Sequence, residues 1–236
     1  MKFETFADGD ALSARAAELL FQQIRDDPHS VLGLPTGRTP IGMYARVVSE
    51  CSREYHCFSE VTTFNLDEYV GIPREHPSSY WSFMSQHLFA HVDLDPARTH
   101  LPNGNAADLA KECERYDRSI RNAGGMNLTF LGLGRNGHIG FNEPGTPFDS
   151  HTRVVVLTES TRQANAPLFT APGEQVPTRA ITMGIATILS SERIVLLVAG
   201  EGKQNAMERL RSREQSEEFP ASALWLHDDV TVLSAV

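Results

Sequence analysis

Hydrophobic and polar positions follow two different periods along the chain. Short, nearly continuous apolar runs rich in β-branched residues predict strands that are buried on both faces. These runs are Ser30–Leu34, Val61–Leu66, Met126–Leu133, Thr152–Leu157, Arg193–Val198 and Val230–Val236. Between them, apolar residues at helical spacing predict helices at Ala11–Arg25, Ile41–Tyr55, Ser78–His91, Ala107–Ala123, Ala180–Leu189 and Gly202–Ser212.

This alternation of strand and helix indicates the α/β class. We expect an open, mostly parallel sheet with helices on both faces, a Rossmann-like arrangement. The 236 residues contain no repeat, low-complexity tract or linker, so a single domain over residues 1–236 is expected.

Composition narrows the classes of function. The N-terminus has no apolar signal segment and no run reaches membrane-spanning length, so we expect a soluble, cytoplasmic protein without a membrane partner. A net charge of -9 argues against a nucleic-acid partner, and an anionic substrate would need a local positive site. Cys51, Cys57 and Cys113 have no metal-type spacing, and reduced thiols are expected.

The segments that follow the predicted strands contain most of the residues suited to chemistry. In open α/β sheets, ligands bind beyond the carboxyl ends of the strands. These segments hold a glycine/threonine loop, two carboxylates, a histidine and a lysine, and they are Pro35–Thr39, Asp67–Tyr69, Gly134–His138 and Gly200–Lys203. The sequence therefore predicts a site at this edge of the sheet.

Two of these segments are suited to a phosphate group. Thr36, Gly37, Arg38 and Thr39 precede a helix, where free backbone N–H groups and the helix dipole favour an anion. The loop is neither a Walker A motif nor GxGxxG, and a plain strand–helix turn capped by Thr39 is the alternative. Lys203 opens a later helix, where it either meets the phosphate as a point charge or is solvated.

The remaining candidates are acid–base groups. Asp67 and Glu68 are adjacent at a strand end, so at most one is expected to face the cleft as a base; a solvated acidic turn is the alternative. His138 titrates near neutral pH and is suited to moving a proton at a sugar ring oxygen, with Glu143 to orient it, unless it is a buried structural histidine. No second His or Cys lies at ligand spacing and no GxSxG motif occurs, so neither a metal nor a serine nucleophile is expected.

Together these segments resemble the glucosamine-6-phosphate deaminase (isomerase) family in its compact bacterial form. The similarity runs almost from end to end through six motifs: Leu34–Gly37, Phe64–Tyr69, His76–Tyr80, Gly137–Gly145, Val176–Gly184 and Phe219–Leu224. It implies an enzyme of the hydrolase class in amino-sugar metabolism and N-acetylglucosamine catabolism. The implied reaction converts glucosamine 6-phosphate to fructose 6-phosphate and ammonia.

The resemblance also implies roles for individual residues. Asp67 would move a proton between C2 and C1, and His138 would open the sugar ring with Glu143 and the residue at position 136 in support. The phosphate would be held by Lys203 and the loop Thr36, Gly37, Arg38 and Thr39. No cofactor is implied, the amino-sugar phosphate is the only expected partner, and the protein would be a monomer or a homo-oligomer.

Four positions depart from the family pattern. Asn136 stands where the best-known members have Asp, which leaves Glu143 to supply negative charge to the imidazole. Pro167 replaces an arginine of a mobile lid that contacts the phosphate, and Arg38 stands where a small residue is usual. The hypothesis is that Arg38 supplies the lost charge. Val155 replaces a lysine of the allosteric members.

Three other functions stay open. Galactosamine 6-phosphate or a related amino-sugar phosphate differs from the implied substrate only subtly. A 6-phosphogluconolactonase is disfavoured by the motifs Asn65–Tyr69 and Phe141–Pro144. A non-catalytic sugar-phosphate sensor of the kind found in transcription regulators would need a helix-turn-helix and a basic face, which an acidic chain of this length does not suggest.

Overall fold

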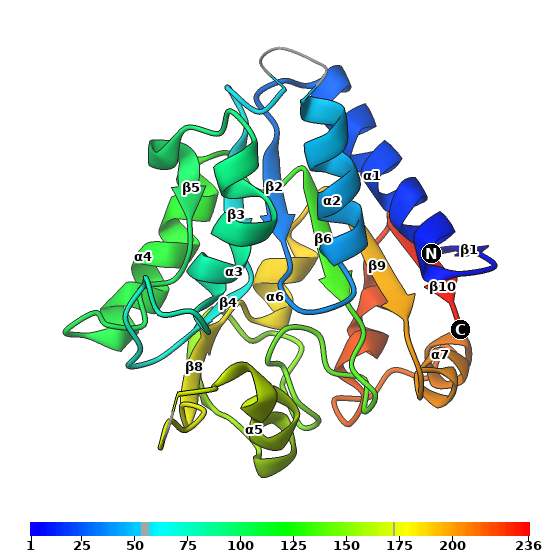
Figure 1. The fold of residues 1–236 in the computed structure, drawn as a ribbon. Coiled ribbons are helices and arrows are strands. Elements are labelled where there is room, and N and C mark those ends of the chain that lie inside the picture. The colour runs from blue at the N-terminus through cyan, green and yellow to red at the C-terminus, as the bar shows by residue number, and fades with distance from the viewer. Residues whose placement is uncertain (53–56, 172) are drawn as a thin grey trace.

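The computed structural model describes residues 1–52, 57–171 and 173–236, and its main element is a seven-stranded parallel sheet (Figure 1). The strand order is β1-β10-β9-β6-β2-β3-β5, and each neighbouring pair is parallel. The strands are β1 Lys2–Thr5, β2 Val31–Leu34, β3 Thr62–Asn65, β5 Thr99–His100, β6 Leu128–Gly132, β9 Arg193–Ala199 and β10 Val230–Ala235. The mostly parallel α/β fold predicted from the sequence is confirmed.

Helices cover both faces of this sheet because its strands present apolar side chains to each. On β9, Val195 and Leu197 join the core beneath α1, α2 and α3, whereas Leu196 and Val198 face the opposite core. The first layer is α1 Gly9–Asp26, α2 Ile41–Cys51 and α3 Tyr80–His87; the second is α4 Leu109–Asn122, α6 Ile185–Leu189 and α7 Gln204–Arg211. None of the helices in the described part of the chain is long and apolar enough to cross a membrane.

A second, antiparallel sheet of order β4-β8-β7 lies beyond the carboxyl ends of the parallel strands, beside α5 (Figure 1). The sequence pattern did not predict this sheet. Its strands are β4 Asp67–Tyr69, β7 Arg153–Val156 and β8 Arg179–Thr182, and α5 spans Glu159–Asn165. The predicted strand Thr152–Leu157 therefore forms here as β7.

The helix predicted at Ala180–Leu189 is wrong in its first half, which forms β8. Ala180 and Ile181 are fully buried between β4 and β7, so pairing on both sides overrides the helical spacing. Gly184 separates β8 from α6, and a side chain there would collide with the backbone carbonyl of Ser150. Short 3₁₀ turns complete the fold at Phe89–His91, Pro96–Arg98, Ala166–Leu168 and Pro220–Leu226.

The expectation of three reduced thiols is corrected by a disulfide between Cys51 and Cys57. Cys51 is the last residue of α2, and the Cα atoms of the two cysteines are 5.7 Å apart. Cys113 on α4 is buried and free. The helix predicted to reach Tyr55 ends at Cys51; positions 53–55 of that prediction lie outside the described residues.

Thiol titration tests this pairing. In denaturant without reductant, we expect only Cys113 to react with a thiol reagent, and all three cysteines after reduction. Three reactive thiols in the unreduced protein would contradict the disulfide.

Candidate active site

The strand order places a topological switch between β2 and β6. From β2 the chain proceeds to β3 and β5 on one side, then returns to β6, β9 and β10 on the other. Because the strands are parallel, the segments that follow β2, β6 and β9 emerge at one edge, toward β8 and α5 (Figure 1). The structure therefore brings together the loop at residues 36–39, the loop that contains His138, and Lys203.

Strand β4 separates the two adjacent carboxylates, as neighbouring residues in a strand point to opposite faces. Glu68 accepts hydrogen bonds from the backbone N–H groups of Tyr69, Tyr80 and Trp81 at 2.8, 3.1 and 3.0 Å, so it holds the start of α3. Glu68 also lines a pocket of about 290 Å³. Asp67 is thus the carboxylate left for the other face.

Asp67 faces the histidine-bearing loop. A Cβ at Gly140 would lie 3.4 Å from Oδ2 of Asp67, so this loop passes directly beside the carboxylate. Asp67 is 6% exposed, and its carboxylate accepts no hydrogen bond from the described residues. Burial, with a smaller contribution from the charge of Glu68, raises the pKa of Asp67 to about 8.

Asn136 links His138 to Glu143. The Nδ1 atom of His138 lies 2.7 Å from Oδ1 of Asn136, and Nδ2 of Asn136 donates to Oε2 of Glu143 at 2.7 Å. The other oxygen of Glu143 accepts from the hydroxyl of Thr161 on α5 at 2.5 Å. Because Glu143 requires the amide nitrogen on its side, the amide oxygen must face the imidazole, and Nδ1 must carry the proton.

This relay leaves Nε2 of His138 as the atom that exchanges protons. The pKa of His138 is lowered, mainly because burial disfavours the imidazolium; Glu143 opposes this effect and the charge of Lys203 adds to it. The imidazole packs directly against Gly134, where any side chain would overlap the ring.

The loop after β2 has the features of an anion site. The backbone N–H groups and side chains of Thr36, Gly37, Arg38 and Thr39 make no hydrogen bond to the described residues. Gly37 has φ 95°, a conformation that favours glycine. Pro40 rather than Thr39 occupies the N-cap of α2, so the Thr39 hydroxyl is not used as a cap. Arg38 is exposed.

Lys203 precedes α7 and donates from Nζ to the carbonyl of Leu133 at the end of β6. Its pKa is lowered, first by burial and then by the positive charge of Arg135. Arg135 was not among the candidates predicted from the sequence, although a basic residue inside a glycine-rich loop after a strand is a usable signal.

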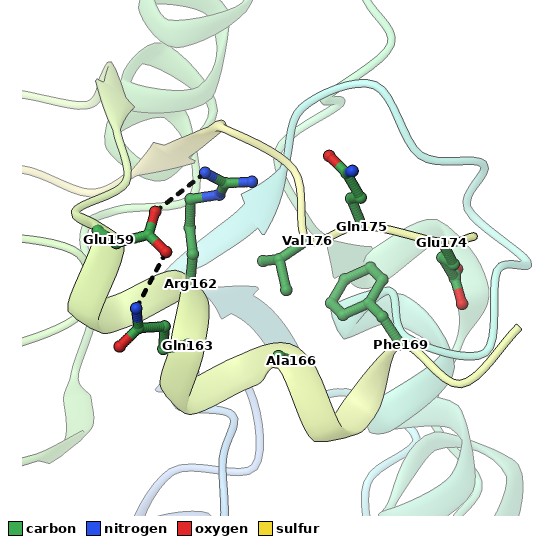
Figure 2. Close-up of a pocket in the computed structure, with 8 residues that line it drawn as sticks. All are labelled: Glu159, Arg162, Gln163, Ala166, Phe169, Glu174, Gln175 and Val176. Atoms are coloured by element: carbon green, nitrogen blue, oxygen red, sulfur yellow. Dashed lines mark hydrogen bonds and ion pairs between the residues drawn. The ribbon is translucent and has the colours of Figure 1, made fainter. Parts of the chain in front are cut away.

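A separate pocket of about 210 Å³ lies on another side of α5 (Figure 2). Glu159 accepts hydrogen bonds from Arg162 at 3.2 Å and from Gln163 at 3.1 Å. Figure 2 shows these two contacts, with Phe169 and Val176 across the pocket. None of the candidate residues lines it. Within the described ranges, no group of three or more His, Cys, Asp or Glu side chains could hold a metal ion.

The chain matches the model of a known protein family over nearly its whole length. Residues 7–233 match the family model described as glucosamine-6-phosphate isomerases/6-phosphogluconolactonase. The chain belongs to this family. The match covers nearly all of the chain, including every segment that contributes to the site; strand β1 and the last residues of β10 lie outside it.

Members of the family named glucosamine-6-phosphate deaminase are similar over the whole chain. The protein of Lysinibacillus sphaericus is 51% identical over 224 residues, which cover 95% of this chain and 94% of the relative. That of Bacillus subtilis, glucosamine-6-phosphate deaminase 1, is 48% identical over 233 residues, 99% and 95% of the two chains. A solved structure described as a monomeric glucosamine-6-phosphate deaminase superposes with a TM-score of 0.95 at 48% identity, covering 99% and 96%.

Similarity to a solved structure of the lactonase branch extends to the fold. The 6-phosphogluconolactonase of Thermotoga maritima superposes with a TM-score of 0.75 at 19% identity, covering 98% of this chain and 97% of that one.

The burial of Asp67 predicts a pH effect on stability. Its pKa is about 8 in the folded protein against an ordinary value of 3.8, so the folded state holds the proton that the unfolded state releases. Stability is then lost as pH rises from about 4 to about 8, at up to about 1.4 kcal/mol per pH unit. We expect Asp67→Asn to remove this pH dependence. The free energy of unfolding of the variant minus that of the wild type should therefore increase between about pH 4 and pH 8 and stay constant above that range.

Urea unfolding at about pH 5, 7 and 9 measures the difference. Glu114→Gln on the exposed side of α4 is the matched control and should give a constant difference. A constant difference for Asp67→Asn as well would contradict an elevated pKa of Asp67.

The amide relay predicts how His138 responds to a charge. Asn136→Asp would place a carboxylate 2.7 Å from Nδ1 and should raise the pKa of His138 by roughly 1–3 pH units, measured by NMR of the imidazole. Asn122→Asp, at the exposed end of α4, should leave it unchanged. A pKa that stays constant in Asn136→Asp would mean that position 136 does not contact the ring in solution.

Proposed function

We propose that this protein converts glucosamine 6-phosphate and water to fructose 6-phosphate and ammonia. The observation that carries the proposal is the position of the Asp67 carboxyl group against Gly140, in the same loop that carries the His138–Asn136–Glu143 relay. Asp67, which would move protons at carbon, and His138, which would open the ring, can thus act on one bound sugar. Full-length similarity to deaminases at about half identity supports the same substrate.

The first step is ring opening. With its Nδ1 proton held by Asn136, neutral His138 can take the O1 hydroxyl proton on Nε2 and deliver it to the ring oxygen as the C1–O5 bond breaks. Glu143 supports this step because its Oε2 atom lies 3.7 Å from Nδ1 of His138, so its negative charge offsets part of the cost of the imidazolium. Lys203 and the loop of Thr36, Gly37, Arg38 and Thr39 hold the phosphate.

The second step is proton transfer between carbons. Asp67 takes the proton from C2 and returns one to C1, while a proton of the substrate ammonium passes to O1, which gives a protonated 2-imine. Water then adds to C2 and ammonia leaves. A base must be ionised, yet the pKa of Asp67 is about 8 in the free protein. The substrate ammonium would supply the missing counter-charge and lower that pKa when it binds. The reaction therefore combines isomerisation with a hydrolytic loss of ammonia.

Ammonia release from glucosamine 6-phosphate and galactosamine 6-phosphate, assayed side by side, tests the proposal. We expect Asp67→Asn to lower kcat by about a hundredfold or more, because a positioned general base contributes that much. Fructose 6-phosphate should still bind with nearly unchanged Kd, and Glu114→Gln should keep full activity.

A wild-type protein that releases ammonia from neither sugar would refute the proposed reaction. A wild type that prefers galactosamine 6-phosphate would change the substrate but leave the mechanism. A small loss of kcat in Asp67→Asn would remove Asp67 from the proton transfer.

A further inference from the structure

Arg135 lies across the loop that carries Lys203. Its Nε atom is 3.2 Å, and its Cζ atom 3.6 Å, from the position that a methyl group would take on Gly202. Gly202 has φ 75°, and Gly200 has φ 97°, so this turn favours glycine at both positions. The missing side chain at Gly202 leaves room for the guanidinium next to Lys203.

Neither cation has a carboxylate partner among the described residues. Other arginines do form ion pairs: Arg15, Arg46, Arg98, Arg115, Arg162 and Arg193. The chain has 30 acidic and 21 basic residues. A shortage of carboxylates therefore does not explain why Arg135 and Lys203 lack an acidic partner within the described ranges. The charge of Arg135 disfavours the ammonium form of Lys203, and a bound dianion would relieve that repulsion.

The position of the pair relative to His138 fits a 6-phosphorylated sugar. Arg135 immediately precedes Asn136, which contacts His138, and the positive charge of Lys203 lowers the pKa of His138. In such a sugar, the ring oxygen and the phosphate are bound to neighbouring carbons, C5 and C6. A ring oxygen that meets His138 therefore brings the phosphate toward Arg135 and Lys203.

We propose that Arg135 binds the substrate phosphate together with Lys203 and thereby selects phosphorylated over unphosphorylated amino sugars. This inference rests on the proposed function. The planar guanidinium can donate two parallel hydrogen bonds to phosphate oxygens, whereas Lys203 acts as a point charge. The clamp is formed by two segments of the parallel sheet's edge, after β6 and after β9, and needs no arginine at Pro167 in the 3₁₀ turn after α5.

Arg38 is the competing cation. It belongs to the loop after β2 and, like Arg135, is exposed and makes no ion pair with a described residue. Nothing comparable to the packing of Arg135 on Gly202 holds its side chain beside Lys203. Arg38→Ala is therefore the comparison that distinguishes the two arginines.

The experiment compares the wild type with Arg135→Ala, Arg135→Lys and Arg38→Ala, and with Arg118→Ala on the exposed side of α4 as the control. Steady-state kinetics are measured with glucosamine 6-phosphate and with glucosamine, and the Kd of inorganic phosphate is measured by calorimetry. We expect Arg135→Ala to raise KM for the phosphorylated sugar and the phosphate Kd by about tenfold to a hundredfold, with kcat nearly unchanged. Arg135→Lys should recover part of the loss, and kcat/KM for glucosamine should not change.

Unchanged KM and phosphate Kd in Arg135→Ala would overturn the inference, and a loss confined to Arg38→Ala would move the role to Arg38. An equal loss of kcat/KM with glucosamine would show that Arg135 acts on something other than the phosphate. If the wild type releases no ammonia while phosphate binding still depends on Arg135, the proposed reaction fails and the phosphate site stands.

Discussion

The hydrogen bonds from the start of α3 to Glu68 set the orientation of the whole site. Three backbone N–H groups hold this carboxylate, which fixes one face of β4. Asp67, the preceding residue, must then face the loop at Gly140. Burial of Asp67 raises its pKa, and the charge of Glu68 is the second, smaller cause. One capping interaction therefore places the base and helps to set its proton affinity.

The two ends of the site hold ionisable groups of opposite type, a carboxyl group and two cations, that have no partner of opposite charge in the described part of the chain. At one end, Asp67 has no cation or hydrogen-bond donor among the described residues; at the other, Lys203 and Arg135 have no carboxylate. An amino-sugar phosphate carries an ammonium group near C2 and a phosphate on C6, so it is complementary to both ends. Such a site costs stability in the free protein, which is expected where groups serve binding rather than folding.

Five strands of the parallel sheet, β2, β3, β6, β9 and β10, could be predicted from the sequence because they are largely buried and form nearly continuous apolar runs. The two edge strands, β1 and β5, were not predicted, because they are short and only partly buried. The second sheet could not be predicted, since β4 has three residues and β8 has a helix-like pattern that only pairing on both sides overrides. The strand-end position of Asp67, His138 and Lys203 was accessible from the sequence. The contact of Thr161 with Glu143 was not, because a hydroxyl on a separate helix gives no local signal.

Substrate binding would adjust both titrating groups in the direction that the reaction needs. Lys203 contributes to the lowered pKa of His138, so a phosphate that neutralises Lys203 and Arg135 would let that pKa rise and make the imidazolium a more available proton donor. At the other end, the substrate ammonium would lower the pKa of Asp67 and ionise the base. Asn136 matters for this balance because the group 2.7 Å from Nδ1 is a neutral amide, while the charged Oε2 of Glu143 lies farther away, 3.7 Å from Nδ1. The imidazole is therefore left to respond to the phosphate, whereas a carboxylate at position 136 would hold it protonated before any sugar arrived.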